Sequence, residues 1–200
     1  MKYWSKIILV PALVGTLFSC SEQQKDPADR YFENGQFEEA VQTYTNNLKN
    51  NPTDVIMLYN RGRAYQEMGD YAKAQADFES ALAQDPNNFQ VLLSLSNVQI
   101  QQKNYGSALL YASKAEEIPG APAMASFLKG RALHHMGMTG EALNAYGNAI
   151  KLDDEFGQAY FNRGMLKIAL EMKKQACEDF KLASVLEYPG ADEALKKYCK

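Results

Sequence analysis

Histidine, cysteine and tryptophan are scarce in this sequence, which contains two, three and one of them, respectively, in 200 residues. The two histidines, His134 and His135, are adjacent, and adjacent helical residues point about 100° apart, so they cannot form a His-x-x-x-His metal site. The sequence has no Gly-x-Ser-x-Gly turn, phosphate-binding loop or dinucleotide fingerprint. These absences argue against an enzyme, and we expect no catalytic residue, metal or cofactor.

A large excess of charge of either sign is also absent. The formal net charge is −3, and 22% of the residues are charged. Without a broad positive field, nucleic acid is not expected as a partner. Because the sequence has no catalytic motif, no small-molecule substrate is expected either. We predict that the adjacent acidic pairs lie on solvated helix faces or helix ends rather than in an acid–base site; these pairs are Glu38-Glu39, Glu116-Glu117 and Glu178-Asp179.

The hydrophobic run near the beginning of the chain is short. Lys2 and Lys6 precede an uncharged segment, residues 7–18, whose 12 residues are too few to cross a bilayer, which needs about 20. A basic start followed by a run of this length is typical of a secretory signal. Residues 1–19 are therefore predicted to be a cleaved signal peptide.

The end of this segment, Leu17-Phe18-Ser19-Cys20, resembles the lipobox of bacterial lipoproteins. The resemblance implies that Cys20 carries a diacylglycerol thioether and an acylated amino terminus, and that residues 20–26 form a lipidated tether. Several acyl chains on one cysteine anchor stably, at about 0.8 kcal/mol per buried CH2. The alternative is an ordinary secretory signal with an incidental cysteine.

The same resemblance suggests a location. In lipoproteins of enteric-type bacteria, a residue other than Asp after the lipidated cysteine, here Ser21, accompanies outer-membrane sorting. We therefore expect a lipid-anchored protein in the cell envelope of a Gram-negative bacterium, at the outer membrane and facing the periplasm.

The rest of the chain repeats every 34 residues. Alanine recurs without exception at one position of this period, and a small residue recurs at another: Ala40, Ala74, Ala108, Ala142 and Ala176; Gly62, Ser96, Gly130 and Gly164. A period of this length indicates a stacked array of helix pairs. Because a mid-helix glycine costs about 1 kcal/mol relative to alanine, its recurrence predicts close helix packing, with aromatic residues such as Phe78 filling the space beside it.

These positions resemble the tetratricopeptide repeat (TPR), and the second repeat fits almost completely, with Leu58, Gly62, Tyr65, Gly69, Tyr71, Ala74, Phe78, Ala81 and Pro86. The resemblance implies an all-α fold, a right-handed α-solenoid of about five helix-turn-helix repeats plus a C-terminal capping helix. We place the repeats at 27–54, 55–88, 89–122, 123–156 and 157–190, and the capping helix at 191–200. Because Pro27 is tolerated only in an opening turn, the first helix is predicted to be short and to start near Asp26.

The tripeptide Asn-Arg-Gly occurs twice, at residues 60–62 and 162–164, three periods apart. Its glycine is the small residue of the repeat. We therefore interpret the tripeptide as part of the packing between helices and not as an anion site.

Two cysteines remain once Cys20 is assigned to the lipid. Cys177 lies 12 residues before Pro189 in the predicted last turn, and Cys199 lies 10 residues after it, so antiparallel helices bring them to nearly the same level. A disulfide between them would attach the capping helix to the array with about 2–4 kcal/mol. Two buried free thiols remain the alternative.

The TPR resemblance also implies a binding surface. In that family the first helix of each repeat lines a concave wall through its positions 2, 5, 9 and 12. Carried onto this sequence, positions 5, 9 and 12 predict a partner groove made of Tyr59, Arg63, Gln66, Leu93, Asn97, Phe127, Arg131, His134, Phe161 and Met165. Apolar side chains flanked by two arginines suit an extended or helical peptide with apolar side chains and some acidity.

Two functions remain open at this point. The first is a membrane-anchored scaffold or adaptor that binds protein partners in the cell envelope through its concave groove. The second is a chaperone-like holder of exported or outer-membrane proteins. Fold resemblance does not choose between them.

Overall fold

The computed structural model describes residues 26–200. The regular secondary structure of this range consists of α-helices. The eleven helices of this region are α1 (Pro27–Glu33), α2 (Phe37–Leu48), α3 (Val55–Glu67), α4 (Tyr71–Gln84), α5 (Phe89–Gln101), α6 (Tyr105–Glu116), α7 (Ala123–His135), α8 (Thr139–Leu152), α9 (Gly157–Ala169), α10 (Lys173–Val185) and α11 (Ala191–Tyr198). The predicted signal peptide and Cys20 lie outside the described residues.

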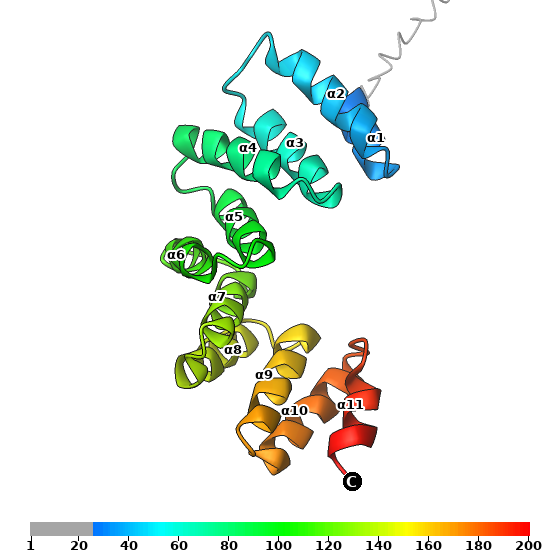
Figure 1. The fold of residues 1–200 in the computed structure, drawn as a ribbon, viewed down its shortest axis with the longest axis vertical. Helices are drawn as coiled ribbons and strands as arrows, with labels where there is room; N and C mark the ends of the chain where they lie inside the picture. Colours follow the sequence, from blue (N-terminus) through cyan, green and yellow to red (C-terminus); the bar gives the residue numbers. More distant parts are fainter. Residues whose placement is uncertain (1–25) are drawn as a thin grey trace, which may run out of the picture.

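Consecutive helices pack against one another to form a curved array (Figure 1). We call the odd-numbered helices α1 to α9 the A helices and the even-numbered helices α2 to α10 the B helices. In Figure 1, α3 and α5 lie toward the inside of the arc, and α11 follows α10 at its end. This arrangement confirms the predicted all-α solenoid. Within residues 26–200, no helix is both long enough and apolar enough to span a bilayer.

Polar residues fix several helix starts. Asp54, Asp70 and Asn88 each accept a hydrogen bond from a backbone N–H of the first turn of α3, α4 and α5. Asp26 does the same for α1, which is only 7 residues long and has Pro27 at its first position. That proline lacks an N–H, so it fits only where the helix has no acceptor to offer.

The turn between the A and B helices needs one residue with a positive φ in every repeat. Gly35, Gly69 and Gly137 supply it with φ of 74°, 77° and 76°, whereas Lys103 and Glu171 adopt φ of 62° and 60° at the equivalent positions. A side chain in this left-handed region costs roughly 1–2 kcal/mol. Two of the five turns therefore carry backbone strain.

The close helix packing predicted from the repeat is confirmed. A methyl group added to Gly62 would lie 2.7 Å from the ring of Phe78, and the same distance separates such a group on Gly130 from Tyr146. Gly164 faces Phe180 in the same way. Each of these aromatic side chains is fully buried, so the B-helix ring occupies the space that the missing side chain leaves.

The third repeat uses a different pair at these two positions. Ser96 replaces the glycine, and Ala112 replaces the aromatic residue. The Ser96 hydroxyl donates a hydrogen bond of 2.9 Å to the backbone carbonyl of Ala108 on the neighbouring helix. The larger residue on one helix is thus matched by a smaller one on the other.

The Asn-Arg-Gly tripeptides serve this packing, as the sequence suggested. Arg61 donates to both carboxylate oxygens of Asp77, at 2.8 and 2.6 Å, and Arg163 does the same with Asp179, at 3.0 and 2.7 Å. Lys167 lies 2.8 Å from the second oxygen of Asp179. In both repeats the arginine therefore joins its A helix to the B helix that follows.

One member of the acidic pairs, Asp179, lies neither on a solvated face nor at a helix end, contrary to the sequence prediction, whereas Glu116 lies at the end of α6, as predicted. Asp179 is only 2% exposed, because its carboxylate is neutralised by Arg163 and Lys167. Glu116 is half-buried and accepts hydrogen bonds from Ser126 and Lys129 of α7. Both carboxylates connect helices.

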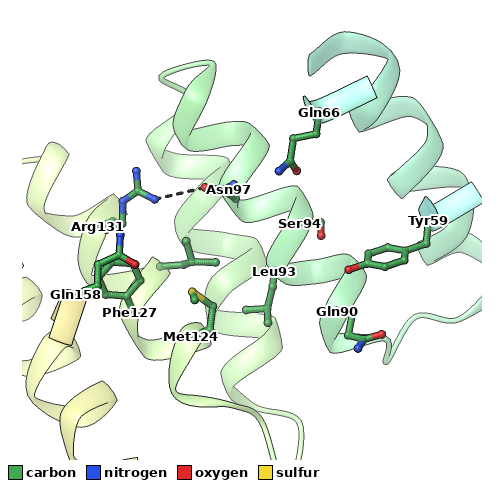
Figure 2. A pocket seen from close by; sticks show the side chains of 11 residues that line it. Tyr59, Gln66, Gln90, Leu93, Ser94, Asn97, Met124, Phe127, Arg131 and Gln158 are labelled. Atoms are coloured by element: carbon green, nitrogen blue, oxygen red, sulfur yellow. Dashed lines mark hydrogen bonds between the residues drawn. The ribbon is translucent and has the colours of Figure 1, made fainter. Parts of the chain in front are cut away.

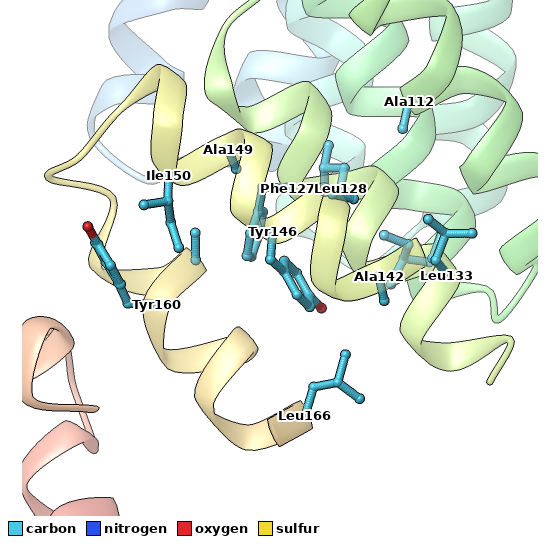
Figure 3. Close-up of a cluster of buried hydrophobic side chains, with 14 of the residues drawn as sticks. Ala112, Phe127, Leu128, Leu133, Ala142, Tyr146, Ala149, Ile150, Tyr160 and Leu166 are labelled. Atoms are coloured by element: carbon cyan, nitrogen blue, oxygen red, sulfur yellow. The ribbon is translucent and has the colours of Figure 1, made fainter. Parts of the chain in front are cut away.

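The largest buried cluster of the described residues extends from the end of α5 through α6 to α9 and into the end of the array (Figure 3). Tyr146 and Phe127 pack at its centre, and Ile150 and Tyr160 join α8 to α9. At the end of the array, a disulfide joins Cys177 of α10 to Cys199 just after α11, with 5.7 Å between their Cα atoms. The bond attaches the last helix covalently to the fifth repeat.

Candidate functional site

The inner wall of the arc contains a cavity of about 400 Å³ (Figure 2). Four consecutive A helices contribute side chains to it: Tyr59 and Gln66 from α3, Gln90, Leu93, Ser94 and Asn97 from α5, Met124, Phe127, Leu128 and Arg131 from α7, and Gln158 from α9. We call these eleven residues the inner cavity. Its lining combines apolar side chains with five amide or hydroxyl groups in addition to Tyr59.

Six of the ten residues predicted for the groove line this cavity: Tyr59, Gln66, Leu93, Asn97, Phe127 and Arg131. The five further lining residues were not named from the sequence. Three of them, Gln90, Met124 and Gln158, occupy position 2 of their repeats, which the family pattern also assigns to the concave wall. The signal for these three was therefore present in the repeat register.

Phe127 forms the floor of the cavity and does not project into it. Only 1% of it is exposed, because its ring packs against Tyr146 at 5.8 Å and against Phe156 at 4.9 Å between centroids. Phe156 precedes α9, and its ring extends this aromatic layer toward the next repeat. The exposed apolar side chain nearby is Met124, one turn earlier on α7.

The other four predicted residues lie outside the inner cavity. The Arg63 guanidinium stacks 4.6 Å from the ring centroid of Phe32, beside a separate cavity near Asp29 and Glu33. The Nδ1 atom of His134 lies 3.5 Å from the hydroxyl oxygen of Tyr146.

Phe161 and Met165 pack at the end of the array. The ring of Phe161 lies 5.1 Å from that of Tyr188 and 5.7 Å from that of Phe180. Met165 packs against the cluster that contains Phe180 and Ala194. Both side chains are partly buried and contribute to the packing at the end of the array.

One cation and no carboxylate line the inner cavity. Arg131 extends toward Asn97, and Nη1 of Arg131 lies 3.4 Å from the side-chain oxygen of Asn97 (Figure 2). Gln66 contributes an unusual group, because its Oε1 is buried and no hydrogen-bond donor of the described chain reaches it. The cavity therefore offers one positive charge, whereas the unpaired oxygen of Gln66 is closed off from solvent.

The two histidines lie near this charge. Burial lowers the pKa of His134, and the neighbouring His135 lowers it further. Burial also lowers the pKa of His135, with a second contribution from Arg131. Both imidazoles therefore favour their neutral form. In the part of the chain that the structure covers, no three His, Cys, Asp or Glu side chains are grouped so as to hold a metal ion.

Comparisons with known proteins identify the repeat. Residues 59–123 match the family described as tetratricopeptide repeat, and residues 28–69 match the family described as TPR repeat. The DnaJ homolog subfamily C member 7 homolog of Dictyostelium discoideum is 26% identical over 168 residues, which are 76% of this chain and 31% of the relative. The chain spans between 10% and 31% of the length of the first two curated relatives.

Solved structures match over a larger share of both chains. MamA residues 41 to the end, from Desulfovibrio magneticus RS-1, superpose with a TM-score of 0.73 at 26% identity and cover 80% of this chain and 90% of that chain. YrrB, described as a TPR protein with an unusual peptide-binding site, gives a TM-score of 0.67 at 24% identity and covers 84% and 88%. Residues 28–123 therefore consist of tetratricopeptide repeats, and the described chain has the fold of a tetratricopeptide-repeat solenoid.

Proposed function

We propose that this protein is a membrane-anchored scaffold that binds a segment of a partner protein in the inner cavity. The observation that carries the proposal is the cavity itself, which spans four repeats and combines an apolar floor with a polar lining. Sites for specific recognition have this composition, since apolar contacts supply affinity and a few polar groups fix orientation. The fold of YrrB, whose description includes a peptide-binding site, supports the same assignment.

A matched pair of substitutions on α5 tests the site. Gln90 lines the inner cavity, and Gln101 ends the same helix without lining it; both are exposed. We expect Gln90→Trp to fill the cavity and abolish recovery of partners that co-purify with the full-length chain, and Gln101→Trp to leave recovery unchanged. Equal recovery with both variants would show that partners bind elsewhere.

The same purification separates the scaffold from the chaperone-like holder. A scaffold yields a few partners in stoichiometric amounts, and a holder yields many weakly bound apolar clients. The cavity favours the scaffold because its polar lining and single cation restrict what can bind.

The membrane anchor is supported by the beginning of the sequence, where Cys20 follows a basic and then an apolar segment. We propose that Cys20 is lipidated and holds the solenoid at the cell envelope of a Gram-negative bacterium, at the outer membrane and facing the periplasm. Metabolic labelling with an alkyne fatty acid tests this assignment. Label is expected on the wild-type chain and not on Cys20→Ser, whereas label retained by Cys20→Ser would exclude this anchor.

A further inference from the structure

The last helix, α11, follows the fifth repeat and takes the place of the first helix of a further repeat, and the disulfide between Cys177 and Cys199 attaches it there. We propose that this disulfide is a redox-controlled latch on the inner wall. While the bond is intact, α11 closes the wall at the fifth repeat, and reduction of the bond by a dithiol opens the wall along α9. The inference concerns the regulation of partner binding and rests on the proposed function.

The inner wall continues along α9 beyond the inner cavity. Gln158, at the start of α9, lines the cavity (Figure 2). Phe161 and Met165 follow it three and seven residues later, so the three side chains lie on one face of the helix. In the repeat register, Phe161 and Met165 correspond to Phe127 and Arg131, which line the cavity on α7. The cavity therefore ends at Gln158 although the wall positions of α9 go on.

α11 packs beside this continuation of the wall. Met165 is partly buried in a cluster that includes Ala194 and Leu195 of α11. Phe161 packs in the same cluster, and a Cβ atom on Gly190, the residue before α11, would lie 3.8 Å from its ring. A partner segment that extends from the cavity toward Met165 would therefore meet α11.

α11 depends on the disulfide because its other contacts are small or exposed. The helix has 8 residues, two of which are buried, and helices shorter than about 12–15 residues are marginal in water. Exposed hydrogen bonds join Ser184 to Asp192 and Lys173 to the backbone oxygen of Lys200. The two cysteines are 22 residues apart, and a bond that closes a loop of this length favours the packed over the released helix about a hundredfold.

Reduction of the bond is a thiol–disulfide exchange. Cys177 and Cys199 are both partly exposed, so a dithiol reductant has access to their sulfur atoms. A thiolate of the reductant attacks one sulfur and releases the other cysteine, and the second thiol of the reductant then displaces the first. The dithiol loses two electrons and becomes a disulfide, and the two cysteines take up two protons and become thiols. An oxidising compartment keeps the latch closed, and a dithiol reductant opens it.

Methionine footprinting of the full-length chain tests the latch. Hydrogen peroxide converts accessible methionines to sulfoxides, which mass spectrometry locates. Met165 is expected to react about tenfold faster in the double variant Cys177→Ser/Cys199→Ser than in the oxidised wild type. Met57, partly buried near the other end of the array, is the control and should react equally in both. The wild type reduced with dithiothreitol and alkylated with iodoacetamide should behave like the double variant.

Two outcomes of the footprinting contradict the latch. An equal rate at Met165 in the oxidised wild type and the double variant would show that α11 stays in place without the bond. Equal acceleration at Met165 and Met57 would show that the bond stabilises the whole array and does not control α11 locally.

Photo-crosslinking connects the latch to partner binding. A photoreactive residue at Met165 should capture a partner in cells that produce the double variant and not in cells that produce the wild type, whereas the same residue at Met124 in the inner cavity should capture it in both. Capture from Met124 together with equal capture, or none, from Met165 in the two backgrounds would overturn the inference and leave the proposed function intact. No capture from Met124 in either background would overturn the proposed function and the inference with it.

Discussion

The contact between Gly62 and Phe78 gives the sharpest stability prediction. A Cβ atom at residue 62 would lie 2.7 and 2.8 Å from two ring carbons of Phe78, and the ring cannot move away because Phe78 is fully buried. Overpacking of this kind costs about 1–3 kcal/mol. The alanine gains about 1 kcal/mol of helix propensity. Gly62→Ala is therefore expected to lower the free energy of unfolding by up to about 2 kcal/mol.

The third repeat shows how the clash can be relieved. Phe78→Ala alone leaves a cavity and should cost about 3–5 kcal/mol. Gly62→Ser combined with Phe78→Ala reproduces the pair Ser96 and Ala112 in the second repeat. The backbone carbonyl of Ala74 would then accept the hydrogen bond that the carbonyl of Ala108 accepts from Ser96. The double variant is then expected to be less destabilised than the sum of its single variants by about 1–2 kcal/mol.

Urea unfolding followed by far-ultraviolet circular dichroism measures these differences, fitted with a nearest-neighbour treatment because repeat arrays unfold in steps. Gly147→Ala is the matched control, since it lies within α8 and its added Cβ would meet only an ordinary contact of 3.7 Å with Arg163. It should stabilise by about 0.5–1 kcal/mol. Additive effects of the two substitutions at 62 and 78, or a stabilising Gly62→Ala, would refute the packing argument.

Four further predictions follow from single contacts. Asp179→Asn removes the buried carboxylate between Arg163 and Lys167 and should destabilise by about 3 kcal/mol in the same unfolding assay, whereas Lys73→Gln, which breaks an exposed ion pair, should change little; equal losses would contradict the role of burial. Lys103→Gly relieves the positive φ of a side chain and should raise stability by about 0.5–1 kcal/mol, while an unchanged midpoint would show that the turn is not strained. Reduction of the disulfide between Cys177 and Cys199 should lower the free energy of unfolding by about 3 kcal/mol and should accelerate amide hydrogen exchange more in α11 than in α3. Equal acceleration in both helices would contradict the claim that the disulfide attaches α11 locally. Because the pKa values of His134 and His135 are lowered in the folded state, the unfolded chain binds more protons as the pH falls. The contribution of the two histidines to stability should therefore be complete above about pH 6.5 and decrease below it. The double variant with Gln at both positions should lose this pH dependence.

Much of the fold was predictable because the repeat constrains the same positions several times. The small residue facing an aromatic ring, as in Gly130 and Tyr146, was predicted from periodicity and confirmed. The ion pairs of Arg61 and Arg163 were missed, although each arginine is followed 16 residues later by an aspartate, Asp77 or Asp179. An arginine and an acid that recur together at one spacing were a readable signal.

The inner cavity was only partly predictable, because residues from outside the repeat pattern decide which side chains stay accessible. Phe156 packs on the buried Phe127, and Tyr188 packs against the partly buried Phe161. Both Phe156 and Tyr188 lie in turns, where the repeat does not dictate the sequence. Arg63 does not line the inner cavity, because its guanidinium stacks on the ring of Phe32 in the short α1. Such contacts depend on the path of the turns and on the first helix, and periodicity carries no information about either.

The central claim is that partners bind in the inner cavity, and site-specific photo-crosslinking tests it most directly. A photoreactive residue at Met124, which is 37% exposed and lines the cavity, should crosslink a partner in living cells. The same residue at Met136, which is 43% exposed at the end of the same helix, should not. Crosslinking at Met124 that disappears with Gln90→Trp is the result that this account predicts. The same partner crosslinked equally well from Met136, or captured at Met124 despite Gln90→Trp, would contradict it.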